Sequence, residues 1–66
     1  MLDRITRLRI AHPELSIEQA RGLLVAQYKT AEDYEGDIDT IMEQFTVAMT
    51  QVDTATLGRM LNYINL

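Results

Sequence analysis

A chain of 66 residues forms one domain at most, covering residues 1–66, and it buries only about 60% of the surface that its unfolded form exposes. Hydrophobic residues make up 47% of the sequence, which argues against a disordered chain, and the lack of cysteine excludes disulfides and thiolate metal sites. The net charge of −4 is divided unevenly: residues 1–29 carry five basic and three acidic side chains, whereas residues 30–66 carry one and seven.

The first expected helix runs from about Asp3 to Ala11. Asp3 is of a residue type that caps helix starts, and it stands four residues before Arg7, in the order that favours an ion pair along a helix. The helix should end at His12, because the residue before a proline, here Pro13, is pushed away from helical geometry. We expect the imidazole of His12, the one histidine in the chain, to cap this end or to contact solvent.

A second helix is expected from Ser16 to about Tyr28. Ser16 and Gln19 have the spacing of a capping box, in which each side chain binds the backbone N–H of the other residue. Gly22 and Ala26 lie one turn apart, so they either let another helix approach closely or face solvent without a role, and both interpretations stay open. The residues expected to face inward are Ile17, Ala20, Leu23, Leu24 and Tyr28.

Residues 30–39 allow two interpretations. The pair Gly36-Asp37 is typical of a helix stop followed by a new N-cap. Ala31 and Tyr34, however, stay in phase with the apolar stripe that follows, as they would on one continuous helix. We therefore expect a single long helix from Thr30 to Gln51, whose first turn can fray or kink.

Two apolar stripes at helical spacing occupy the C-terminal half, and Asp53 separates them. Two amphipathic helices joined by a short turn must pack against each other or against a partner, because neither can bury its stripe alone. We predict an all-α fold, a small bundle of three or four helices in which Ile38–Gln51 and Thr54–Asn65 form a C-terminal antiparallel hairpin. The first stripe consists of Ile38, Ile41, Met42, Phe45, Ala48, Met49 and Val52.

Charged residues form two candidate partner-binding groups. Like charges repel one another at this helical spacing, so an acidic stripe on the long helix suggests a basic protein partner, unless it is simply a solvated face. The arginines of the first helix could also lie against this stripe, within the chain or across a dimer. The acidic stripe consists of Glu32, Glu35, Asp39 and Glu43, and the basic ridge consists of Arg4, Arg7 and Arg9.

The acidic segment can also be compared with a calcium-binding loop. With Gly36 at the sixth position of such a loop, three ligand positions are filled, by Asp33, Glu35 and Asp39. The first ligand and the closing bidentate carboxylate are missing, so a tight calcium site is not expected. A weak divalent-cation-binding protein is therefore an alternative function, and an acidic DNA mimic that inhibits a basic protein is another.

The remaining composition argues against several function classes. Six basic residues against ten acidic ones do not favour direct nucleic acid binding, and no run approaches 18 apolar residues, as a membrane span requires. No glycine-rich phosphate loop, nucleophile elbow or paired histidine and carboxylate is present. We expect a non-enzymatic, cytoplasmic interaction or regulatory module without cofactor or metal. We expect it to self-associate as a homo-oligomer, and its small size would suit a bacterial or phage accessory protein.

Overall fold

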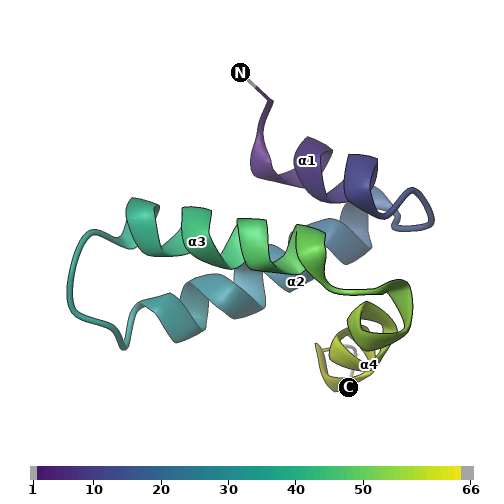
Figure 1. The fold of residues 1–66 in the computed structure, drawn as a ribbon. Coiled ribbons are helices and arrows are strands. Elements are labelled where there is room, and N and C mark those ends of the chain that lie inside the picture. Colours follow the sequence, from purple (N-terminus) through teal and green to yellow (C-terminus); the bar gives the residue numbers. More distant parts are fainter. Residues whose placement is uncertain (1, 65–66) are drawn as a thin grey trace.

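Four helices make up the part of the chain that the structure, a computed structural model, describes, which is residues 2–64. They are α1 (Arg4–Ala11), α2 (Ile17–Ala31), α3 (Ile38–Gln51) and α4 (Thr54–Ile64), and these residues contain no strand (Figure 1). α2 and α3 run antiparallel side by side, α1 packs against both, and α4 packs against α2. The predicted all-α bundle is confirmed. Within residues 2–64 no helix combines the length and the apolar character that crossing a membrane requires.

All four helices begin in the same way, with a short polar side chain that accepts a hydrogen bond from the backbone N–H three residues later. Ser16 and Gln19 form the complete capping box, with both hydrogen bonds present. These local interactions fix the helix starts, so the starts predicted near Asp3, Ser16 and Asp53 are confirmed. The accepting side chains are Asp3 (2.7 Å), Ser16 (3.0 Å), Asp37 (3.3 Å) and Asp53 (2.7 Å).

The predicted continuous helix from Thr30 to Gln51 is wrong, because α2 ends at Ala31 and α3 begins at Ile38. Gly36 lies between them with a φ of 118°, a conformation that L side chains rarely adopt. Asp37 then accepts hydrogen bonds from the backbone N–H and the hydroxyl of Thr40. The local stop and restart signal therefore outweighs the apolar phase.

Tyr34, which was predicted to lie on the long helix, packs from the turn instead. Tyr34 lies edge-on to the ring of Phe45 on α3, with the ring centroids 5.8 Å apart. Phe45 itself is half-buried. An apolar residue in a turn can thus cover part of a helix stripe without being in the helix.

Two glycine substitutions are expected to have opposite effects on stability. Gly36→Ala should lower the free energy of unfolding by about 1–3 kcal/mol, because alanine is strained at this positive φ. Gly58→Ala is the matched control, since Gly58 is helical in α4 and a methyl group there would meet no atom within 4 Å. It should raise stability by about 0.4–1 kcal/mol. Urea denaturation followed by circular dichroism measures the free energy of unfolding of both variants. Equal changes for the two variants would contradict the expectation that alanine is strained at position 36.

The core joins all four helices around a small set of buried side chains. Ile5, Leu24 and Met60 pack against this set and are partly buried themselves. Ile17 and Tyr28, which were predicted to face inward, are about half exposed, and Ala48 of the α3 stripe is exposed as well. The buried cluster consists of Leu8, Leu15, Ala20, Leu23, Met49 and Leu57.

The pairing of the last two helices differs from the predicted hairpin. α4 packs chiefly against α2, and its contacts with α3 are few, so the antiparallel pair of the bundle is α2 with α3. α3 is already in contact with α1 and α2, and the apolar side of α4 is buried against α2, where Leu57 joins the same core cluster as Ala20 and Leu23. Asn65, the predicted last residue of this helix, lies outside the described residues.

Candidate functional site

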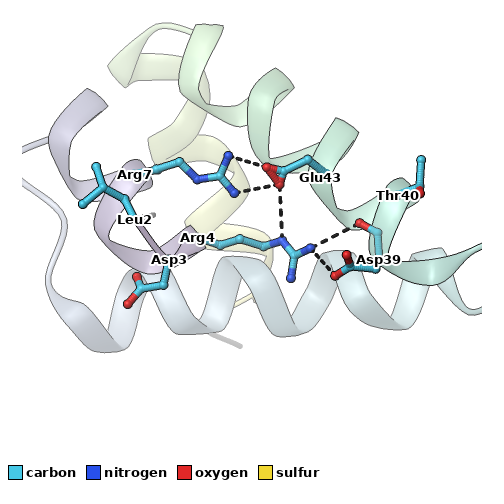
Figure 2. A pocket seen from close by; sticks show the side chains of 7 residues that line it. All are labelled: Leu2, Asp3, Arg4, Arg7, Asp39, Thr40 and Glu43. Atoms are coloured by element: carbon cyan, nitrogen blue, oxygen red, sulfur yellow. Dashed lines mark hydrogen bonds and ion pairs between the residues drawn. The ribbon is translucent and has the colours of Figure 1, made fainter.

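The predicted basic ridge and acidic stripe meet where α1 crosses α3 (Figure 2). Arg4 donates from Nη2 to Oδ1 of Asp39 over 2.7 Å and to the Asp39 carbonyl over 3.2 Å. Arg7 donates from Nη2 to Oε2 of Glu43 over 2.7 Å, and its Nη1 pairs with the other carboxylate oxygen. Arg4 Nε lies 3.8 Å from Glu43 Oε2, which links the two pairs into one charge cluster.

This charge cluster, Arg4, Arg7, Asp39 and Glu43, uses the candidate binding residues to hold the chain together. Each arginine has a carboxylate partner, and each side chain comes from a different turn of α1 or α3 (Figure 2). Charges that are already paired offer less attraction to a foreign partner than unpaired ones do. Of the two arrangements that the sequence allowed for the arginines, the structure has the one within the chain.

The other candidate residues do not join the cluster. Arg9 donates from Nε to the carbonyl of Leu15 over 3.1 Å, so it holds the turn after α1. Glu32 and Glu35 are exposed in the segment between α2 and α3. The acidic stripe is therefore divided, because the turn at Gly36 removes Glu32 and Glu35 from the helix that carries Asp39 and Glu43.

The charge cluster also shifts the pKa values of two side chains, Glu43 and Arg7. The hydrogen bond from Arg7 is the main cause that lowers the pKa of Glu43, and the charges of Arg7 and Arg4 act in the same direction against partial desolvation. The same hydrogen bond raises the pKa of Arg7. The carboxylates that cap helix starts, Asp3, Asp37 and Asp53, also have lowered pKa values because they accept hydrogen bonds there.

Acid is expected to destabilise the protein through these carboxylates. A group whose pKa is lower in the folded than in the unfolded state stabilises the fold above its unfolded pKa, and this contribution is lost as the pH falls through the folded pKa. The melting temperature should therefore be nearly constant between pH 7 and about pH 5 and fall below about pH 4.3.

Glu43→Gln tests the contribution of the cluster to this acid sensitivity. The variant should melt below the wild type at pH 7, and the difference should vanish as the pH falls, because Glu43 is then protonated in both states of the wild type. Glu32→Gln is the control, since the Glu32 side chain makes no ion pair or hydrogen bond within residues 2–64. If the melting temperature of Glu43→Gln stayed below that of the wild type by the same amount at every pH, Glu43 would not contribute to the acid sensitivity.

The calcium alternative loses one of its ligands to the charge cluster. Asp39, which would fill the ninth loop position, is bound to Arg4. Asp33 and Glu35 remain exposed in the turn, and Asp37 is engaged as the N-cap of α3. In the described part of the chain, no three histidine, cysteine, aspartate or glutamate side chains come close enough together to hold a metal ion.

Of the two roles predicted for His12, capping and solvent contact, the structure shows capping and excludes solvent contact. His12 is only 3% exposed, and its Nε2 lies 2.9 Å from the carbonyl oxygen of Met49. Because a carbonyl only accepts, Nε2 carries the hydrogen of this bond. Met49 lies in the last turn of α3, where carbonyls have no partner within the helix. His12 therefore ends α1 with its backbone and caps the end of α3 with its ring.

Among the side chains that the structure describes, α2 carries three exposed large hydrophobic residues, Ile17, Val25 and Tyr28, more than any other helix. The exposed residues of this helix within about 120° of its circumference define the α2 outer face: Ile17, Glu18, Arg21, Val25, Tyr28 and Lys29. Val25 is 49% exposed and Tyr28 is 47% exposed. Arg21 and Val25 line two open hollows, one toward α1 and one toward Tyr63 of α4, so they form the ridge between them.

Sequence reasoning missed the α2 outer face because it assigned Ile17 and Tyr28 to the core. The available signal was the helical wheel: α2 carries apolar residues around most of its circumference, more than one buried face needs. Gly22 and Ala26 border this face and line the hollow beside Tyr63, which favours the interpretation of a surface open to a close approach.

The comparisons give no relative from which a function could be transferred. The chain matches no protein-family model, no curated protein and no solved structure. Function is therefore inferred from the surface of this chain itself.

Proposed function

We propose that the protein is a non-enzymatic helical interaction module that works by associating with itself through the α2 outer face. The observation that carries this proposal is the ridge of Arg21 and Val25, flanked by Tyr28 and by two open hollows. Tyrosine and arginine are among the side chains that contribute most to protein interfaces. A paired α2 would cover both hollows at once.

The size of the core supports the same proposal. Six buried side chains form the central cluster of this chain, whereas eight large hydrophobic residues of the described part are exposed. Association is the remaining way for a chain of this length without cysteine to bury more apolar surface. The proposed assembly is a homo-oligomer in the cytoplasm, where the lack of cysteine is compatible with a reducing environment.

The internal pairing of charges supports an apolar rather than an electrostatic interface. Asp39 and Glu43 are neutralised by Arg4 and Arg7, so the carboxylates of the predicted acidic stripe that are left for a basic partner are those of Glu32 and Glu35. A DNA mimic needs carboxylates spread along a surface as phosphates are along a duplex. We therefore favour self-association over recognition of a basic protein.

Solution mass as a function of concentration tests the proposed function. Sedimentation velocity from micromolar to millimolar protein should show a mass that rises above the 7.6 kDa of one chain. Val25→Glu should keep the protein monomeric at concentrations where the wild type associates, because a charge then lies in the proposed interface.

Val47 provides a matched control for this experiment. It is a valine of similar exposure, 44% against 49% for Val25, but it lies on α3, away from the α2 outer face. Val47→Glu should therefore leave the association unchanged. A wild-type mass of 7.6 kDa at every concentration would overturn the proposed function, and an equal effect of both substitutions would overturn the assignment to α2.

A further inference from the structure

Four residues of α2 form a narrow stripe along one side of the α2 outer face. Glu18, Gly22, Val25 and Lys29 follow one another at steps of four, three and four residues. At about 100° per residue they lie within about 60° of the helix circumference. All four line the same open hollow of about 540 Å³, whose opposite wall is Tyr63.

The order of these residues makes the stripe complementary to a second copy of itself that runs in the opposite direction. The steps are the same in both directions, so an antiparallel copy places Glu18 opposite Lys29 and Gly22 opposite Val25. A parallel copy would instead place Glu18 opposite Glu18 and Lys29 opposite Lys29, where like charges repel. The stripe therefore fits one relative orientation of two α2 helices.

The surroundings of the stripe leave these residues available for a partner. Glu18 and Lys29 are exposed, and neither side chain takes part in an ion pair or a hydrogen bond within residues 2–64. Gly22 is half-buried and carries no side chain that would cover its backbone. Tyr63 is 83% exposed, and its ring can pack over a helix that enters the hollow.

We infer that the occupant of this hollow is α2 of a second copy, packed antiparallel about a two-fold axis. The inference rests on the proposed self-association and names its geometry. Val25 of each copy lies against Gly22 of the other, and two symmetric ion pairs join Glu18 to Lys29 of the second copy. The dyad repeats each contact, as an isologous dimer requires.

Charge reversal tests this geometry without disturbing the core. Glu18→Lys alone and Lys29→Glu alone should each raise the dissociation constant of the dimer by roughly tenfold or more, because both symmetric pairs become repulsive. The double substitution Glu18→Lys/Lys29→Glu should restore the wild-type constant. An equimolar mixture of the two single variants should form a heterodimer, in which every facing pair is again of opposite charge.

Sedimentation velocity measures the dissociation constants, and circular dichroism verifies that the variants keep the helical fold. The antiparallel α2 pair would be overturned if neither charge reversal changed the dissociation constant, or if the two single variants failed to associate when mixed. Either result would leave self-association itself in place. A wild type that stays monomeric at millimolar concentration would overturn the proposed function instead. Restoration in both the double variant and the mixture supports the inference.

Discussion

Leu8→Ala is expected to lower the free energy of unfolding by about 2–5 kcal/mol, because it removes a fully buried side chain from the centre of the core. Leu8 comes from the shortest helix, and the cluster that it joins holds residues from each of the other three. A domain of this size has a total stability of about 3–10 kcal/mol, so this one substitution should remove a large part of the stability of the protein.

Ile10→Ala is the matched control for this substitution. Ile10 lies in the same helix two residues away, but it is 63% exposed, so its truncation should change stability by no more than about 0.5 kcal/mol. Urea denaturation gives both values. Similar losses for the two variants would mean that α1 does not present Leu8 to the core.

His12→Leu is the second substitution with a large expected effect, a loss of about 1–3 kcal/mol. Leucine fills part of the space of the ring but cannot donate to the Met49 carbonyl, which then remains buried without this partner. Because the bond joins the end of α1 to the end of α3, its loss should also loosen the last turn of α3.

His12→Gln distinguishes the hydrogen bond from the packing of the ring. The glutamine amide can reach the position of the imidazole Nε2 and donate to the same carbonyl, so this variant should recover part of the lost stability. Thermal melts give the order of stability, and amide hydrogen exchange reports on residues 49–52. If the leucine variant were as stable as the wild type, the cap on α3 would be of no energetic importance.

The charge cluster illustrates how far a sequence pattern can predict a site. The residue types and the helical spacing predicted that Arg4, Arg7, Asp39 and Glu43 would bind groups of opposite charge. The pattern could not decide between an internal and an external partner, because that choice depends on how α1 crosses α3. The distances of 2.7 Å within the chain decide it.

Local sequence determined where the helices of this protein begin and which class of fold they build. Caps such as Ser16 and Asp53 act over three residues, and the turn at Gly36 depends on the freedom of a single backbone position, so both can be found without knowledge of the rest of the chain. The turn was outweighed in our prediction by the phase of Tyr34, which contacts Phe45 from outside the helix.

Only the tertiary structure decided which surfaces are buried and which remain open. The tertiary structure packs α4 on α2 rather than on α3 and buries His12 under the end of α3, and it leaves Val25 and Tyr28 exposed. Each of these outcomes depends on residues that are far apart in the sequence. Helical periodicity gives each helix an apolar side but does not say which neighbour covers it. The α2 outer face, on which the proposed function depends, stays open because α1, α3 and α4 pack against other sides of α2 and no helix within residues 2–64 covers it.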